Sequence, residues 1–246
     1  MKTLNTYINE WKATDKSFKH IKLKTYFVYN QSVMNYDSPI KIFNNFWKQF
    51  NNYKDKVYDI YGHNVELDTS GYTKNYYSFG EHKFYIEDID YITDCSTMFS
   101  DCVQLIKVPL FDTNKVINMY HMFNNCYSLE EVPLFNTVNV ELMNAMFQGC
   151  HKLVEIPFFD THNVTNISYM CFECKKIKRV PKFDTTNVKK MNHMFCWDEN
   201  LRDVPLLNID KVENMNHMFS NCNNLSEKTK KEWSQIYDFE KDDKKI

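Results

Sequence analysis

Cysteine and histidine side chains with the spacing of metal ligands occur in one part of the chain. Cys171 and Cys174 form a C-x-x-C pair, and His193 and Cys196 follow as H-x-x-C. Three thiolates and one imidazole form a set that binds zinc tetrahedrally. A C-x-x-C pair can also cycle between dithiol and disulfide. These four residues are the first candidates for chemistry, and the alternative is that they pack in a core.

Other patterns that indicate catalysis are absent from the sequence. It contains no G-x-S-x-G, no phosphate-binding Gly-rich loop and no H-E-x-x-H. Gly149 is the only glycine after residue 88, so close approach of the backbone to a nucleotide is not expected. We therefore expect a protein that is not an enzyme and that binds no cofactor or metal.

A repeat of 24 residues bears on the choice between the two interpretations of the cysteines. Methionine recurs in register at Met98, Met122, Met146, Met170, Met194 and Met218. Phenylalanine follows it at Phe99, Phe123, Phe147, Phe195 and Phe219, with Cys171 in its place once. Cysteine comes three residues later at Cys102, Cys126, Cys150, Cys174 and Cys222, with Asp198 in its place once. Cys171 and Cys174 thus occupy apolar columns, which favours packing. Disulfides between neighbouring repeats and a metal site remain as alternatives.

Histidine shares another column of the repeat, directly before Met-Phe. It holds His121, His193 and His217, and also threonine, alanine and tyrosine. Two histidines on adjacent repeats could bind a metal or respond to pH. Because the column accepts such different residues, we expect it to be exposed and without a special role.

One repeat alone is too small to fold, because its few large apolar side chains do not offset the entropy of ordering 24 residues. Neighbouring repeats must supply the missing contacts, so the fold extends as a stack. L-x-x-V-P predicts a short strand in each rung, the structural unit formed by one repeat, and a parallel face of such strands in the stack. The following N-V-x-x-M-x-x-M-F predicts a helical or 3₁₀ turn. Asp112, Asp160 and Asp184 precede that turn, where a carboxylate can accept backbone N–H bonds.

The residues "MFNNCYSLEEVPLFNTVNVELMNAMF" resemble the BspA-like leucine-rich repeats, whose units follow M-F-x-x-C-x-x-L-x-x-L and F-D-T-S-N-V-x-x-M. The resemblance covers about residues 88–225 and implies a leucine-rich-repeat-type solenoid of about six rungs. That family is known mainly from bacterial surface and adhesin-like proteins. Compact members also occur in phage genomes, and "LNTYINEW" at the N-terminus is similar to a segment of gut-phage proteins.

The flanks of the array predict caps, because a stack must cover both ends of its core. We expect residues 1–87 to form a small α+β cap, with helices over 4–12 and 38–61, a strand over 22–29, and a hairpin of 64–70 with 75–86. Residues 88–225 form the solenoid. Residues 226–246 form a capping helix that begins at Ser226, followed by a tail. The fold class expected is an α/β-type repeat solenoid.

Composition limits the partners. The net charge is −2, which argues against a phosphate backbone as ligand, so we expect no nucleic acid. The chain has no run of about 18 apolar residues, so we expect no insertion into a membrane. The first 18 residues carry charges where a signal peptide needs an apolar stretch, so we expect a cytoplasmic location, or a virion-associated one for a phage protein.

The predicted strand face carries the candidate binding residues. Two columns lie between its buried Leu and Val positions, and their charge changes from acidic in the middle of the array to basic near Lys178. The selected residues are Lys107, Glu131, Glu155, Lys178, Arg179, Arg202 and Asp203. Variable side chains on a constant scaffold are typical of a protein-recognition surface, and also of an ordinary solvated face. We expect binding of a protein partner through this face. The alternative is a structural or virion-associated spacer that docks through residues 1–87.

Overall fold

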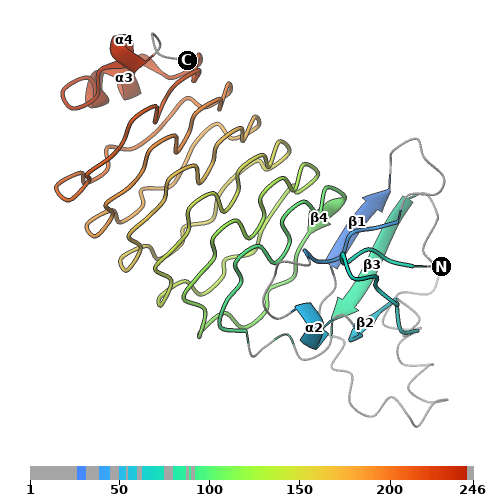
Figure 1. Ribbon diagram of the computed structural model, residues 1–246. Coiled ribbons are helices and arrows are strands. Elements are labelled where there is room, and N and C mark those ends of the chain that lie inside the picture. Colours follow the sequence, from blue (N-terminus) through green and yellow to red (C-terminus); the bar gives the residue numbers. More distant parts are fainter. Residues whose placement is uncertain are drawn as a thin grey trace.

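The computed structural model describes residues 27–31, 39–44, 50–53, 55–59, 63–74, 80–86, 89 and 92–242. In the last of these segments the chain winds into successive rungs that lie side by side (Figure 1). Parallel bridges join equivalent positions of neighbouring rungs: Asp94–Asn118, Asn118–Leu142, Leu142–Asn166, Asn166–Lys190 and Lys190–Asn214. The predicted repeat-type fold is confirmed.

Backbone hydrogen bonds between rungs concentrate in the segment around Met-Phe. Alternate N–H groups there, those of residues 95, 97, 99 and 101, each donate to the carbonyl group 23 positions later. The next rung repeats the pattern from residues 119, 121, 123 and 125. The helical or 3₁₀ turn predicted here is wrong for the described residues 92–226, which form hydrogen-bonded turns instead. Three-residue spacing of buried side chains thus also suits a stack of tight turns.

The predicted strand face is only partly present. Its one strand is β4, Leu105–Lys107, and its bridges between rungs are Lys107–Glu131 and Arg179–Asp203. A proline lies two positions after the bridged residue of each of these short stretches, and proline has no N–H to donate. The ladder therefore stops before a continuous parallel sheet can form.

Two positions in each rung have a left-handed backbone. The first comprises Thr97, His121, Ala145, Tyr169, His193 and His217, with φ between 54° and 59°. The second comprises Asp101, Asn125, Gly149, Glu173, Trp197 and Asn221, with φ between 57° and 75°. At Gly149 an added Cβ would lie 2.8 Å from Asn125 Oδ1, so a larger residue in this rung would require the Asn125 side chain to move.

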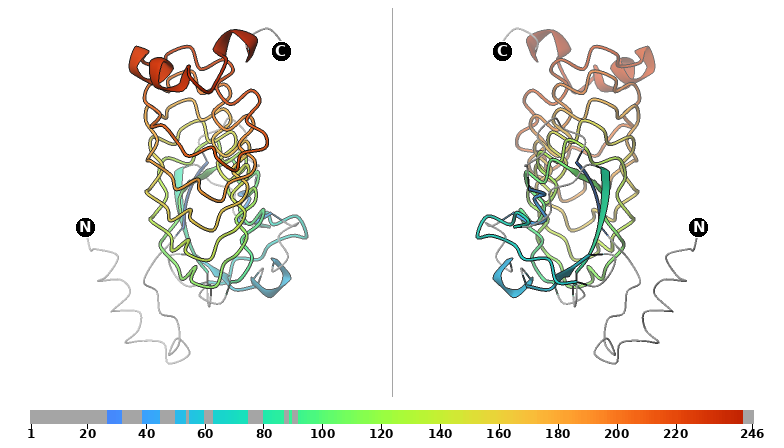
Figure 2. Two further views of the ribbon diagram at one scale, coloured as in Figure 1. Left: turned by 90° about the vertical axis from the view of Figure 1, so that its left-hand side faces the viewer. Right: turned by 90° about the vertical axis from the view of Figure 1, so that its right-hand side faces the viewer.

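The core runs along the stack as columns of like side chains. Phe99, Phe123 and Phe147 stack with ring centroids 5.5 and 5.7 Å apart and ring planes 3° and 2° from parallel. Phe195 and Phe219 continue the column at 5.8 Å. Cys171 fills the gap between the two groups and is fully buried. Figure 2 shows that successive rungs follow a similar outline, as such columns require.

An antiparallel sheet lies at the N-terminal end of the stack. Its strand order is β2 (Val57–Tyr58), β3 (Gly80–Ile86), β1 (Phe27–Gln31) and β4. The strand β1 pairs with β3 in a register that places Phe27 opposite Phe84, and it also pairs with β4 of the first rung. The Phe27 ring lies 5.4 Å from that of Phe99, so this sheet covers one end of the core.

Several predictions for this end are wrong in detail. In the described part of residues 38–61, the expected helix is present only as α2, Phe50–Tyr53. Before it, Ile40 and Ile42 are buried in non-helical backbone that exchanges hydrogen bonds with Gly71 and Thr73. The turn around Gly71 is present with a Leu67–Thr73 bridge, but β3 pairs with β1 and β2 instead of residues 64–70. The strand expected over 22–29 is described only from residue 27, and the helix over 4–12 lies outside the described residues.

Two short helices lie at the C-terminal end of the stack (Figure 1). The helix expected from Ser226 is present as α3, Glu227–Trp233, with Ser226 as its N-cap, and α4 spans Phe239–Asp242. The indole of Trp233 is fully buried and donates its N–H to the carbonyl of Val204 at 3.2 Å. Its ring packs edge-on against Phe219 at 5.2 Å, so α3 covers the last phenylalanine of the core.

Candidate functional site

The cysteines of the repeat form a hydrogen-bonded column inside the stack. In four rungs the Sγ atom donates to the carbonyl 27 residues earlier, at 2.9–3.2 Å, from Cys126, Cys150, Cys174 and Cys222. All eight cysteines of the chain are buried free thiols. Burial raises the pKa of Cys126 and Cys150 well above its usual value, so these thiols stay protonated and unreactive. Packing is therefore the role that the geometry supports, and the disulfide alternative is wrong.

The C-x-x-C and H-x-x-C residues do not converge on a metal site. Cys171 and Cys174 lie in two core columns, and burial raises the pKa of both thiols. The His193 ring lies between the rings of Tyr169 and His217, with centroids 4.6 and 4.9 Å away. Among the described residues, no three or more His, Cys, Asp or Glu side chains gather as metal ligands would.

The histidine column is not the exposed column that its mixed composition predicts. Its members share the first left-handed position, Ala145 is buried, and His121, His193 and His217 are half-buried. Burial lowers the pKa of His121. The column is therefore set by backbone conformation, which residue types alone do not reveal.

Asp198 is a buried carboxyl group that replaces cysteine in its column. Oδ1 accepts the N–H of Cys174 at 2.6 Å, and Oδ2 is buried with no hydrogen-bond partner among the described residues. Burial raises the pKa of Asp198 well above its usual value, and the nearby Cys174 thiol is the second cause of this rise. The group is thus neutral in the folded protein, which suits a buried packing position better than an exposed reactive one.

Exposed apolar side chains follow the proline at one position of each rung. Leu110, Leu134, Phe158 and Leu206 are 45–68% exposed, while Lys182 holds the same position in the fourth rung. The repeated large apolar residues elsewhere in the rung are mostly below 10% exposed, so this row stands apart from the core columns. A regular row of exposed apolar groups is typical of an interaction surface.

Shallow hollows lie beside this row. One is lined by Val154, Pro157 and Phe158 together with Lys178 and Arg179. The next is lined by Arg179, Lys182, Pro205 and Leu206 together with Lys228 of α3. We call this continuous surface, from Val154 to Leu206, the proline groove. Its floor is formed by the Val-Pro or Ile-Pro pairs 156–157, 180–181 and 204–205.

The predicted binding residues all lie on one side of the row, and the structure brings them together in part. Lys178, Arg179 and Arg202 are exposed near the proline groove, and Arg179 pairs with Asp203 at 3.3 Å. Glu155 lines the groove without an ion pair among the described residues. Lys107 and Glu131 pair with each other at 2.6 Å in the two rungs that precede the groove. Lys176 and Lys228 also line the groove, but they lie outside the two columns selected from the sequence.

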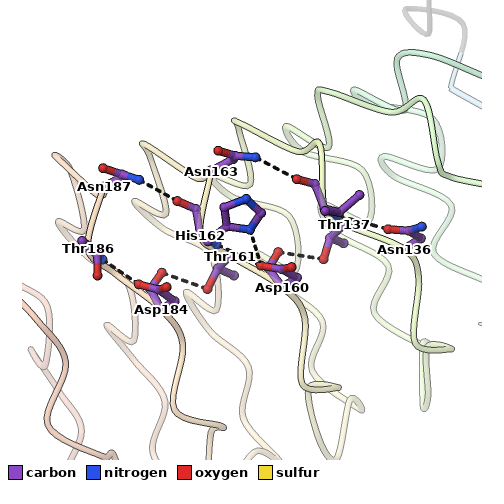
Figure 3. Close-up of polar contacts among 10 residues, drawn as sticks. Asn136, Thr137, Asp160, Thr161, His162, Asn163, Asp184, Thr186 and Asn187 are labelled. Atoms are coloured by element: carbon purple, nitrogen blue, oxygen red, sulfur yellow. Dashed lines mark hydrogen bonds and ion pairs between the residues drawn. The ribbon is translucent and has the colours of Figure 1, made fainter.

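Side-chain hydrogen bonds hold the next corner of each rung in place (Figure 3). Threonine Oγ1 donates to the carbonyl 23 positions later, as Thr137 does to Asp160 at 2.8 Å and Thr161 to Asp184 at 2.9 Å. The amide group of Asn187 donates to the carbonyl of His162 at 2.8 Å. These bonds link each rung to the next just after the apolar row, so the spacing of that row is fixed.

The aspartates predicted to accept backbone N–H groups do so. Oδ1 of Asp112 accepts from Asn114, that of Asp160 from His162, and that of Asp184 from Thr186. Asp160 also contacts the His162 ring nitrogen at 2.6 Å, and that side-chain bond is the main cause of its lowered pKa. The pKa of Asp184 is lowered mainly by the backbone N–H of Thr186. Both carboxylates therefore act as turn acceptors.

No helix in the described part of the chain combines the length and the apolar character needed to cross a bilayer. The arrangement as a whole offers a rigid exposed surface, with apolar row, shallow groove and excess cations, that can contact another macromolecule.

Comparisons with known proteins concern the repeat array. Residues 73–179 and 152–241 match the family described as "Mycoplasma protein of unknown function, DUF285". The crystal structure of the T. pallidum leucine-rich repeat protein TpLRR is similar over 58% of this chain and 76% of that one, with 19% identity and a TM-score of 0.40. Among curated protein sequences, none matches this chain significantly.

Proposed function

The chain belongs to the DUF285 family, and from that premise we propose that it is a non-catalytic interaction module that binds another protein through the proline groove and the apolar row beside it. The proposal includes a relationship to the BspA-like leucine-rich repeats, with the rungs as a leucine-rich-repeat-like solenoid.

One observation carries this proposal. Leu110, Leu134, Phe158 and Leu206 are large apolar side chains that occupy the same position of four rungs and are about half exposed or more. Solvent exposure of one such residue needs no explanation, but a regular row of them is disfavoured in water unless a partner covers it. Charged residues that vary from rung to rung border the row and supply a means of selecting the partner.

Charge reversal tests the proposal in the full-length chain. The variant Lys178→Glu/Arg179→Glu/Arg202→Glu changes the charge beside the groove without touching a buried side chain. The matched control Lys189→Glu/Lys190→Glu/Lys211→Glu makes the same change in net charge at exposed lysines outside the groove. The partner is first identified by cross-linking to the wild-type chain in its native cells.

We expect the groove variant to bind that partner at least about tenfold more weakly, because opposite charges at an interface become like charges. The control should bind within about twofold of wild type, since exposed charges outside the interface contribute little. Equal binding by both variants would move the docking site away from the groove. That result would favour docking through residues 1–87.

A further inference from the structure

The spacing of the rungs limits what can lie along the apolar row. Stacked phenylalanines of neighbouring rungs are 5.5–5.8 Å apart, and backbones joined by parallel bridges are about 4.8 Å apart. The exposed side chains that follow each proline therefore repeat at about 5 to 6 Å along the axis of the stack. A partner that contacts several rungs must present its own side chains at a matching interval.

An α-helix meets this requirement and an extended strand does not. Side chains three and four residues apart line one face of a helix and recur at its 5.4 Å pitch. On one face of a strand, side chains recur about every 6.7 Å, which exceeds the rung spacing by about 1 Å or more. Leu110 and Leu206 are four rungs apart, and over this length the mismatch grows to about 4 Å or more. The side chains of an extended partner would then be displaced from the row by most of one rung spacing. A helix stays in register over the whole row.

The charged side chains beside the row determine which sign of charge the partner must carry. Arg179 is paired with Asp203, and Lys228 lies 4.0 Å from Glu232. Among the described residues, Lys176, Lys178 and Lys182 have no such partner, while Glu155 is the one acidic side chain of the groove without an ion pair. The groove therefore keeps an excess of positive charge around Phe158 and Leu206.

From spacing and charge together, we propose that the partner segment is an acidic amphipathic helix that lies along the axis of the stack. Its apolar side chains, three and four residues apart, contact Leu134, Phe158 and Leu206, and its acidic side chains face Lys178 and Lys182. This inference rests on the proposed function, because it describes the partner of the same surface.

A display selection against the full-length chain tests the proposal of an acidic helical partner. Two libraries of 20-residue segments with equal diversity are used, one constrained to be helical by cross-links and one constrained to be extended in a hairpin. Selected segments are synthesised, and their binding is measured by fluorescence anisotropy. The proteins compared are wild type, Phe158→Ser in the row, and the control Ile117→Ser. Ile117 is a similarly exposed apolar residue outside the groove, with 54% exposure against 68% for Phe158.

We expect groove-dependent binders to come from the helical library. They should carry apolar residues three and four positions apart and an excess of Asp and Glu. Their affinity should fall at least tenfold for Phe158→Ser and less than twofold for Ile117→Ser. Circular dichroism checks that both variants remain folded.

Three results would overturn the inference. Groove-dependent binders that are extended, or that have no acidic excess, would refute the helical partner and leave the proposed function standing. Self-association of the chain that Phe158→Ser abolishes, measured by sedimentation, would make a second copy the occupant. If no binder from either library distinguishes Phe158→Ser from wild type, the groove is not an interaction surface, and the proposed function fails as well.

Discussion

Asp198 shows how a single residue departs from the pattern around it. Five rungs place a cysteine at this position, and in four of them Sγ donates to a carbonyl of an earlier rung. A buried carboxyl group with a raised pKa must keep its proton in the folded chain, and Oδ2 of Asp198 has no hydrogen-bond partner in the part of the chain that the structure describes. Such a group destabilises the fold at neutral pH, because the unfolded chain can ionise it and the folded chain resists ionisation.

The variant Asp198→Cys should therefore stabilise the protein. The N–H of Cys174 keeps a second acceptor, the carbonyl of Cys171 at 3.0 Å, so removing the carboxylate leaves it bonded. At pH 7 we expect a gain of about 1–3 kcal/mol in the free energy of unfolding, the usual cost of an unsatisfied buried polar group. Urea unfolding at several pH values measures it.

The gain should depend on pH in one direction. Above the ordinary carboxyl pKa of 3.8 the unfolded chain loses its proton, and the folded chain keeps it until the raised folded pKa is reached. Wild-type stability therefore falls with rising pH over that interval, so the advantage of Asp198→Cys is smallest near pH 3 and grows above about pH 4. An advantage that is constant between pH 3 and pH 7 would show that ionisation of Asp198 is not the cause. The exposed Asp112→Asn serves as control.

The columns of buried residues could be predicted from the sequence because equivalent positions of every repeat are buried. Cys171 in the phenylalanine column and Asp198 in the cysteine column are both fully buried, as their positions in the repeat imply. The sequence did not reveal that the column of His193 and His217 has a left-handed backbone, because that conformation is normally marked by glycine or asparagine. Here inter-rung hydrogen bonds impose it on residues of any type.

At the scale of elements, the sequence predicted the C-terminal helix α3, but within the repeat array it predicted which segments are buried and not their secondary structure. The L-x-x-V-P segment forms one three-residue strand, β4, because prolines interrupt the ladder between rungs. The N-V-x-x-M segment, predicted as helical, carries the continuous bridges from Asp94 to Asn214. Both patterns describe burial correctly. Hydrogen bonding between distant residues, which no local pattern encodes, decides the backbone.

The helix α3 makes a prediction at this scale. Replacement of its buried Trp233 by alanine should cost about 3–5 kcal/mol of unfolding free energy, because the indole covers Phe219 and bonds to Val204. The control Trp197→Ala removes an indole that is 39% exposed and should cost about 1 kcal/mol or less. Chemical unfolding of both variants measures the difference. Equal losses would mean that α3 does not cap the core.

At the scale of the whole molecule, function depends on the regular spacing of the rungs. The proposed division into residues 1–87, 88–225 and 226–246 stays a prediction, while the contacts of Phe27 with Phe99 and of Trp233 with Phe219 link the first and last parts to the array. Between these ends, the apolar row is useful to a partner only if its side chains lie on one line at equal intervals. The exposed row itself could be found in the sequence, as the column after proline. The groove beside it, with Lys228 contributed by α3, required the fold.

Distances between spin labels along the apolar row test that spacing most directly. The double variants Leu110→Cys/Leu206→Cys and Leu134→Cys/Leu206→Cys place labels four and three rungs apart, and the buried native thiols should not react. Pulsed electron paramagnetic resonance should give about 20–23 Å for the first pair, and a value shorter by about 5–6 Å for the second. Equal distances for the two pairs, or a difference above about 10 Å, would contradict the stack of evenly spaced rungs on which the binding surface depends.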